Sequence, residues 1–588
     1  MRQGRLLWQR GNESLAGVGL ALDVSPEALP PGARTLETNV SMTNRRSRAP
    51  LRLLLVTGGR TIPTWLSTCI ADVERCGAAK LVLALRMAPA NVRGSRRFPR
   101  LIRWLFFRLH QHLDRYLFRA VPDALAPVAL PAGLPGCRAL DGAGLPPPAL
   151  ARTLHAERID VVLDPFGLAP ATWLAGASRY GVWSTLLGRE NEPRTQSAPA
   201  FWEVIEGTPV IEARLCVRRP ACDQPVSPYI SVSPTDRRSV SRSQNQAYWK
   251  LAAALARMLG RLWEDAEAFA ERLRAAPPVV AAEGVSRPPG NAEMLRAWSV
   301  LIRRYVTDKR RSALYREQWA LAYQLGVGDR LVTGALQPLI PPPDRQWADP
   351  FPVRHGNAYY IFHEEEPFST RRGTIALTVV DDQGEVAPTV PVLHQDCHLS
   401  YPFVFHWDGD FFMIPETAAR QRVELYRCVS FPMHWRLERV LLSGVRALDP
   451  TPAFLFGRWW LFANVPAYGA GTWDELHAFY ADSPVGPWAP HRNNPVKSDA
   501  RSARPAGRIF ESQGQFYRPA QDCSRRYGYA VSVNRVLRLD PDTYEEVEVE
   551  KVLPDWSPQV AGVHTLNHTG DMTVIDCLVR RRNTRLNP

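Results

Sequence analysis

Polar and charged residues stand at the starts of five apolar segments in the second half of the chain. Each segment leads into a turn glycine, and these glycines are Gly356, Gly409, Gly457, Gly514 and Gly570. When the segments are aligned on the glycines, their starts carry Asp349, His398 with Ser400, Asp449, Arg504 and His564. Carboxylates and imidazoles can exchange protons with a substrate, and a guanidinium can bind phosphate. These residues are therefore the candidate site that the rest of the chain must position.

A second polar set follows the turns. The strands after the turns end with Glu364–Glu366, Glu416, Asn464, Gln521 with Asp522, and Asp576. Two strands joined by a tight turn are antiparallel, so the start of the first and the end of the second lie on the same side. Both polar sets are therefore predicted on one face of a β structure.

The five units form a repeat. Their turn glycines are separated by 53, 48, 57 and 56 residues. A period of roughly 50 residues, each with enough strands for a small sheet, is typical of a β-propeller. We predict five blades over residues 336–588, whose inner strands bring the polar residues together at the axis of one face.

Chemical type suggests a role for each candidate. We predict acid–base roles for the catalytic residues Asp349, Asp449, Glu416 and His398. We predict substrate contacts from Ser400, Arg504, Arg518, Asp522, His564 and Asn567, with the arginines on phosphate. A structural role competes for each single residue, because an Asp before a proline often bonds backbone amides. We predict neither a metal ion nor a cofactor.

Composition narrows the class of protein. The chain has 588 residues, a net charge of +14 and nine cysteines without a CxxC pair. That length predicts at least two domains, and the scattered thiols favour a reducing cytoplasm. The basic residues are spread without a nucleic-acid-binding motif, so no nucleic acid partner is predicted, although attraction to an anionic membrane surface stays open. Residues 101–118 predict an amphipathic helix packed on its own domain, with a membrane-surface helix as the alternative.

The chain divides into four parts. Residues 1–50 read as a flexible leader, and residues 51–220 as an α/β domain with a doubly wound sheet. Residues 221–335 are interpreted as a linker and a helical connector, with helices near 248–275 and 292–309. The predicted propeller follows from residue 336.

The α/β part resembles the N-terminal domain of folate-dependent formyltransferases. The resemblance covers roughly residues 51–220 and is carried by the Asp-Val-Val-Leu strand at 160–163, Tyr-Gly-Val-Trp-Ser at 180–184 and Phe-Trp-Glu-Val at 201–204. The family uses an Asn and a His just after the Gly-Val strand. Here Ser184 takes the place of the Asn and no His follows, so we predict a related fold that has lost formyl transfer.

The propeller part resembles two families. The Trp-Ala-Asp-Pro-Phe stretch at 347–351 and the later Asp449-Pro450 look like five-bladed arabinanase- and invertase-like glycosidases, which implies Asp349 as base or nucleophile, Asp449 as support and Glu416 as acid. A closer resemblance covers residues 340–580. Its motifs include His-Leu-Ser-Tyr-Pro at 398–402, Met-Ile-Pro-Glu at 413–416 and Arg-Pro-Ala-Gln-Asp at 518–522. They are similar to the N-terminal domain of plant glucosamine inositolphosphorylceramide transferases, which implies work on a glycolipid or surface glycan.

Four functions compete. The first is a cytoplasmic group transferase in cell-surface glycan or glycolipid biosynthesis, acting on a sugar, sugar-phosphate or glycolipid held at the axial face. The second is a glycoside hydrolase of the five-bladed class, and the third is a non-catalytic glycan-binding protein. The fourth, folate-dependent formyl transfer, is weakened by the missing His. The predicted cytoplasmic location weakens the second, and the axial acid and base groups weaken the third.

Overall fold

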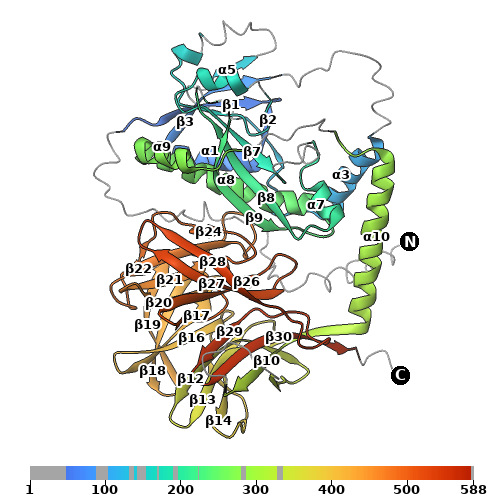
Figure 1. Ribbon diagram of the computed structural model, residues 1–588. Helices are drawn as coiled ribbons and strands as arrows, with labels where there is room; N and C mark the ends of the chain where they lie inside the picture. Colours follow the sequence, from blue (N-terminus) through green and yellow to red (C-terminus); the bar gives the residue numbers. More distant parts are fainter. Residues whose placement is uncertain are drawn as a thin grey trace.

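The computed structural model has an α/β domain and a β-propeller that are joined by one long helix, α10 (Asn291–Leu314) (Figure 1). It describes residues 48–87, 104–130, 138–141, 152, 154–168, 171–189, 197–220, 222, 224–279, 287–326 and 336–583. Residues 1–47 of the predicted leader and the basic cluster at 93–100 lie outside the described residues. No described helix is both long and apolar enough to cross a bilayer.

The α/β domain is built on a seven-stranded sheet. Its strands, in spatial order, are β5 (Arg138–Asp141), β3 (Ala79–Arg86), β1 (Leu51–Thr57), β6 (Val161–Leu163), β7 (Val182–Leu187), β8 (Val210–Arg218) and β9 (Val226–Pro234). The strands from β5 to β7 run parallel, and β8 and β9 are antiparallel. Continuous apolar runs such as Leu-Arg-Leu-Leu-Leu-Val in β1 suit a parallel sheet that is covered on both faces.

Two apolar cores lie on the two faces of this sheet. One core joins β1 and β8 to α1 (Thr64–Arg75), α8 (Val240–Glu264) and α9 (Ala266–Ala275). The other joins β1 and β3 to α5 (Ala171–Gly176). Two predictions about the connector were therefore wrong. Strand β9 lies where a linker was expected, and α8 belongs to the α/β core because Leu251, Leu255 and Leu259 pack into it.

Helix α3 (Leu105–Leu117) does not bury the side that its apolar pattern predicts. It turns Phe107, His110 and Asp114 inward. The Asp114 carboxylate accepts bonds from the Ser241 amide at 2.7 Å and the Ser239 hydroxyl at 3.2 Å, which anchors the helix through its polar side. Four leucines, one per turn, are left exposed: Leu105, Leu109, Leu113 and Leu117. The expectation that this apolar face packs on its own domain is corrected accordingly.

The propeller has five sheets, which confirms the predicted five blades. The first blade holds β12 (Arg345–His355), β13 (Ala358–Pro367), β14 (Thr374–Asp381) and β15 (Val390–Leu393). The second holds β16 (Ser400–Trp407), β17 (Asp410–Thr417), β18 (Arg422–Ser430) and β19 (His434–Ser443). The third holds β20 (Leu448–Leu455), β21 (Arg458–Asn464), β22 (Glu475–Ala481), β23 (Ala489–Pro490) and β24 (Lys497–Ser498). The fourth holds β25 (Phe510–Ser512), β26 (Gln515–Asp522), β27 (Ala530–Leu539) and β28 (Tyr544–Val552).

The fifth blade closes the ring with strands from two distant parts of the chain. It contains β29 (Leu566–Thr569) and β30 (Met572–Arg582) together with β10 (Tyr315–Leu325) and β11 (Gln337–Leu339). Strand β10 pairs with β30 along its whole length, from Tyr315 opposite Arg582 to Leu325 opposite Met572. This pairing links the two ends of the propeller within one blade, while each blade keeps an outer edge strand. The propeller therefore begins at Tyr315 rather than at the predicted residue 336.

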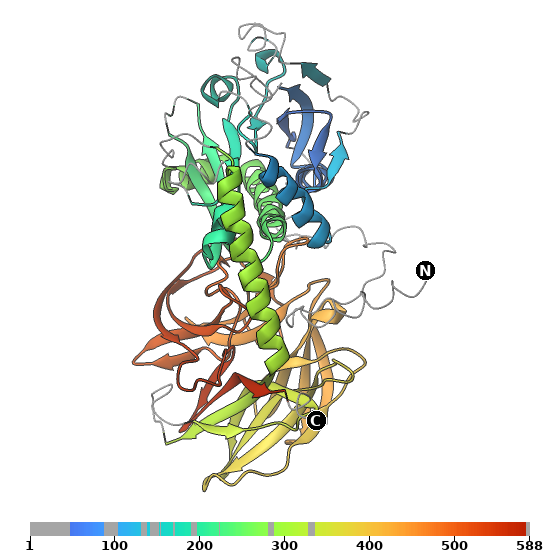
Figure 2. The same ribbon diagram turned by 90° about the vertical axis from the view of Figure 1, so that its right-hand side faces the viewer.

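The α/β domain rests on the propeller face at which the inner strands begin. Buried Lys250 of α8 pairs with Asp474 ahead of β22 at 2.9 Å. The Tyr229 hydroxyl of β9 donates to Glu475 and lies within hydrogen-bond distance of the Ser498 hydroxyl, both at 3.1 Å, and Val232 forms an isolated bridge with Asp499. Helix α10 runs down one side from the α/β domain to the first strand of the fifth blade (Figure 2). The predicted polar face of the propeller is thus also the face toward the other domain.

Candidate functional site

The starts of the inner strands carry a repeated backbone distortion. Asp349, Tyr401 and Asp449 have φ angles of 53°, 47° and 51°, and each precedes a proline. The pairing register shifts at the same place in β12, β16 and β20. A bulge with a left-handed residue is costly for these residue types and recurs where a side chain must be aimed at a site. The distortion therefore coincides with both candidate aspartates.

Asp349, His564 and Asp576 form the first polar group of the axial site. The Asp349 Oδ1 atom lies 3.3 Å from His564 Nε2 and accepts the Thr565 hydroxyl at 2.7 Å. On its other side, His564 Nδ1 lies 2.7 Å from Asp576. Asp576 also accepts backbone N–H groups from Asp349, His564 and Thr565, so it holds the two inner-strand starts together. The predicted residues Asp349 and His564 are therefore in direct contact.

Asp449 and Arg504 form the second polar group. The Arg504 guanidinium donates two hydrogen bonds of 2.5 and 3.1 Å to the Asp449 carboxylate. Gln521 donates to the same carboxylate at 2.9 Å. Glu416 accepts the backbone N–H of Asp449 at 3.1 Å and lies 3.9 Å from Arg504 Nη2. The Nη1 atom of Arg504 makes one long bond of 3.4 Å to the Thr472 carbonyl. Asp449 is thus largely occupied by its own neighbours.

The buried carboxyl groups of the two polar groups have perturbed pKa values. Burial raises the pKa of Glu416 to about 8, and the charge of Asp449 adds to this shift. Burial also raises the pKa of Asp349, to about 6, although His564 opposes it. Burial lowers the pKa of His564, but Asp576 and Asp349 outweigh that effect and raise it overall. Near neutral pH the site therefore combines a protonated Glu416 with a largely ionised Asp349.

An aromatic wall borders these groups. The Trp319 ring lies 4.2 Å from His564 and the Tyr527 ring 5.2 Å from it, measured between ring centroids. Arg504 stacks over Tyr527 at 5.1 Å, and Trp473 follows at 6.1 Å from Tyr527. Sequence reasoning missed all three aromatic residues, because they lie outside the inner-strand starts. Apolar ring faces of this kind suit the C–H faces of a sugar.

The predicted residue His398 lies in a neighbouring group. Its Nε2 atom is 3.2 Å from Glu364, and its Nδ1 atom accepts the Gly373 N–H at 2.9 Å. Burial, helped by Arg371, lowers the pKa of His398 to about 4, whereas burial and neighbouring carboxylates raise that of Glu364 well above its usual range. Buried Ser400 stands opposite Glu416 in the β16–β17 pairing. His398 is thus neutral at pH 7 and held by the backbone.

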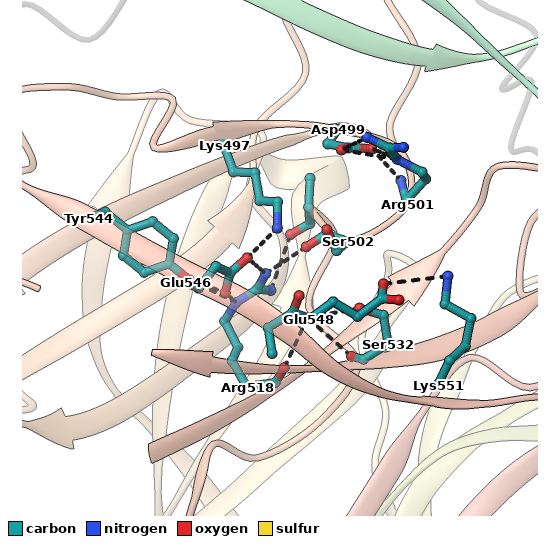
Figure 3. Close-up of polar contacts among 12 residues, drawn as sticks. Lys497, Asp499, Arg501, Ser502, Arg518, Ser532, Tyr544, Glu546, Glu548 and Lys551 are labelled. Atoms are coloured by element: carbon teal, nitrogen blue, oxygen red, sulfur yellow. Dashed lines mark hydrogen bonds and ion pairs between the residues drawn. The ribbon is translucent and has the colours of Figure 1, made fainter. Parts of the chain in front are cut away.

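Three predicted substrate residues point elsewhere. Arg518 is buried against Glu546, with bonds of 2.7 and 2.9 Å, and Lys497 lies 2.6 Å from the same carboxylate (Figure 3). Asp522 pairs with Lys551 at 2.9 Å. The Asn567 amide donates to the Pro350 carbonyl and accepts the Arg508 N–H, both at 2.7 Å. Each side chain is engaged in packing the propeller rather than in either axial polar group.

Two trios have the ligand types of a divalent cation: Asp349, His564 and Asp576, and Glu364, Glu366 and His398. In the first trio, Asp576 accepts three backbone N–H groups, which explains its position without a cation. In the second, Glu366 is bonded by Gln346 at 3.3 Å and pairs with Arg371 at 3.1 Å. The expectation that the protein uses no metal stays a prediction.

Residues 322–562 match the family model described as glucosamine inositolphosphorylceramide transferase 1, N-terminal. The match lies in the propeller. The rice (Oryza sativa subsp. japonica) protein of that name is 37% identical over 206 residues, and the Arabidopsis thaliana protein is 36% identical over 211. These alignments cover 34% and 35% of this chain, and the chain spans 28% of the length of each relative.

Solved structures of glycoside hydrolases also match part of this chain at low identity. Zg3597, a family 117 glycoside hydrolase of Zobellia galactanivorans, is 13% identical with a TM-score of 0.30, over 46% of this chain and 93% of that one. CoXyl43, a GH43 β-xylosidase/α-arabinofuranosidase from a compost microbial metagenome, is 12% identical with a TM-score of 0.31, over 45% and 96%.

Proposed function

We propose that this protein is a group transferase that acts on a sugar or sugar-phosphate during glycolipid or surface-glycan assembly. The substrate would bind at the axial face of the propeller. The observation that carries the proposal is the pair of buried axial carboxyl groups, Asp349 held by His564 and Thr565 and Glu416 beside Arg504, whose pKa values are raised to about 6 and about 8. Such a separation assigns a base and an acid within one site. The 37% identity to glucosamine inositolphosphorylceramide transferases supports the glycolipid context.

Each axial residue has a proposed role. Asp349 takes the proton of the attacking group, with His564 and Asp576 fixing its position. Glu416 donates a proton to the leaving oxygen. Asp449 and Arg504 form an ion pair beside Glu416, and Arg504 Nη1 faces the phosphate of the substrate. Trp473 and Tyr527 hold the sugar ring by stacking.

A thermal-shift panel followed by product analysis tests this proposal. Wild type, Asp349→Asn, Glu416→Gln and the control Asp382→Asn are compared with nucleotide sugars, sugar phosphates, inositol phosphates, oligosaccharides and folates. Asp382 pairs with Arg354 on an exposed part of the first blade, so its substitution leaves the axis intact. We expect a phosphorylated sugar to stabilise wild type and the control, and turnover to require Asp349 and Glu416. Stabilisation by folates alone, equal in all four proteins, would refute the axial site.

Glycoside hydrolysis is the second candidate, because a buried acid and a second carboxylate also suit that chemistry. It differs in its product. A hydrolase releases a free sugar into water, whereas a transferase passes it to an acceptor. Sugar binding without any product would instead indicate a glycan-binding protein. The resemblance of residues 51–220 to formyltransferases stays a prediction, which the folate arm of the panel tests.

We also propose that the protein works in the cytoplasm, at the surface of an anionic membrane. The support is α3, whose exposed leucines Leu105, Leu109, Leu113 and Leu117 form one stripe with Arg108 and Arg115 beside it. Flotation with vesicles of phosphatidylglycerol and phosphatidylcholine tests this placement. Leu109→Asp with Leu113→Asp should abolish flotation. Equal flotation of wild type and the double variant would exclude α3 as the contact.

A further inference from the structure

A cavity of about 490 Å³ lies where the α/β domain, α10 and the propeller meet. Its walls come from the segment that joins α7 (Phe201–Glu206) to β8, from the segment between β9 and α8, from one side of α10, and from the loop between β26 and β27. Five arginines line it: Arg237, Arg303, Arg304, Arg311 and Arg525. We call this cavity the arginine pocket. It is separate from the axial polar groups and contains none of their residues.

The five arginines of the arginine pocket outnumber the two acidic residues that line it, Glu206 and Asp308. Of the two acidic residues that line it, Asp308 is taken by Arg238, which stands outside the pocket, at 2.6 Å. Arg304 donates to the Val204 and Ile205 carbonyls at the end of α7, at 2.6 and 2.9 Å. The side chains of the other four arginines form no ion pair with any residue that the structure describes.

The arginines line the cavity from both sides of the domain boundary, and Arg525 stacks over the Tyr529 ring at 5.3 Å. Arg525 belongs to the propeller, whereas Arg237 belongs to the α/β domain and Arg303 to the connecting helix. Like charges that share a cavity repel, and an anion bound among them would replace that repulsion with several charge-assisted bonds. Burial and the charges of Arg237 and Arg303 lower the pKa of Arg304, which agrees with this crowding.

Hydroxyl groups add the donors that a tetrahedral anion needs. Thr208, Thr235 and Ser524 line the pocket, and so does Thr307, whose own hydroxyl donates to the Arg303 carbonyl at 2.8 Å. Thr235 is only 6% exposed, and its hydroxyl has no hydrogen-bond partner. An unsatisfied buried hydroxyl beside a group of arginines favours an oxygen-rich ligand. We propose that the arginine pocket binds the phosphate group of a sugar phosphate, diphosphate or phosphodiester.

One loop connects the arginine pocket to the axial site. Residues 523–529 join β26 to β27. Ser524 and Arg525 line the pocket, and Tyr527, two residues later, lies against both His564 and Arg504. A phosphate in the pocket is thus held by the loop that also borders the proposed sugar position. This assignment of the bound phosphate to the reacting substrate rests on the proposed function, whereas the anion site itself does not.

Isothermal titration with pyrophosphate on the full chain tests the site. Arg525→Ala and Arg303→Ala should each weaken binding about tenfold or more, because each removes a charged donor. Two matched controls remove an arginine that does not line the pocket. The first is Arg526→Ala, because Arg526 is the next residue after Arg525 but pairs with Glu317 at 2.7 Å. The second is Arg310→Ala, because Arg310 is exposed on α10. Both controls should bind pyrophosphate like wild type.

The outcomes separate this proposal from the proposed function. Equal affinity in all five proteins, or no measurable binding to wild type, would overturn the arginine pocket. Pyrophosphate binding that survives in Asp349→Asn with Glu416→Gln, while Arg525→Ala abolishes it, supports the pocket whether or not the axial residues are catalytic. If Arg525→Ala folds poorly, Arg303→Ala gives the same test at an exposed position of α10. Competition by myo-inositol 1-phosphate would favour a lipid headgroup as the source, and competition by a sugar nucleotide alone would favour a soluble donor.

Discussion

Asp349 and Glu416 are expected to set the pH range of activity. Activity should rise through about pH 6 as Asp349 loses its proton, and fall above about pH 8 as Glu416 loses its own. Glu416→Gln should lower kcat by about 100- to 10,000-fold and remove the alkaline decline, because a general acid is lost. The measurement is a pH–rate profile of the variant and of Asp382→Asn. A decline above pH 8 that persists in Glu416→Gln would contradict the assignment.

The same carboxyl group predicts a change in stability. Its folded pKa of about 8 lies above the ordinary value of 4.5, so the folded state binds the extra proton. Stability from this group is complete below about pH 4.5 and is lost as pH rises toward 8. Glu416→Gln should therefore show a free energy of unfolding that depends less on pH in this window. Urea unfolding at several pH values measures it, and an unchanged pH dependence would refute the shift.

Tyr401 is expected to support the propeller axis. Its hydroxyl accepts the Gly507 N–H at 2.7 Å and lies 2.9 Å from the Thr451 hydroxyl, in a fully buried position. Tyr401→Phe leaves the Gly507 N–H without a partner and should cost about 1–3 kcal/mol in unfolding free energy. Urea unfolding measures this cost. Tyr517→Phe, whose hydroxyl bonds exposed Gln515, is the control and should change little.

At the scale of the element, the turn glycines allowed the blades to be predicted from sequence. All five have positive φ in the structure, as a tight turn requires. Tyr401 was missed at the site because alignment on the glycines placed His398 and Ser400 at the start of its blade. The better signal was a following proline, which Tyr401 shares with Asp349, Asp449 and Arg504. The Arg504–Asp449 pairing could not be predicted, because it joins neighbouring blades and depends on how the ring closes.

The strand pairing that closes the fifth blade could not be predicted from the sequence either. Strand β10 lies far from β30 in sequence, so no local pattern indicates that the two pair. Ala320→Pro in β10 should lower the free energy of unfolding by several kcal/mol. Strand β10 has a neighbour on each side, β11 and β30, and proline removes a backbone donor from this pairing. His434→Pro is the control, since it begins the edge strand β19, where proline is tolerated. Thermal unfolding distinguishes the two, and equal melting temperatures would contradict the role of β10 in closure.

At the scale of the whole molecule, the α/β domain and the propeller are coupled through a buried polar contact. Lys250 and Asp474 are 0% and 1% exposed and lie 2.9 Å apart, and burial raises the pKa of Asp474 although Lys250 opposes it. Composition gave no indication of this pair, because neither residue belongs to a motif. The pair closes the α/β domain over the face that holds the axial groups. Docking of the domains is therefore part of the architecture of the proposed site.

Lys250→Met should uncouple the domains. It leaves Asp474 buried without its cation, which is expected to cost about 3–5 kcal/mol. Because the loss falls at the domain boundary, calorimetry should show the α/β domain and the propeller unfolding separately in the variant but together in wild type. Lys250→Met with Asp474→Leu should restore most of the stability, since no charge is then left unpaired. Lys80→Met, at an exposed position of β3, is the control for loss of a lysine. A single transition at the wild-type temperature in Lys250→Met would show that the pair contributes nothing to docking.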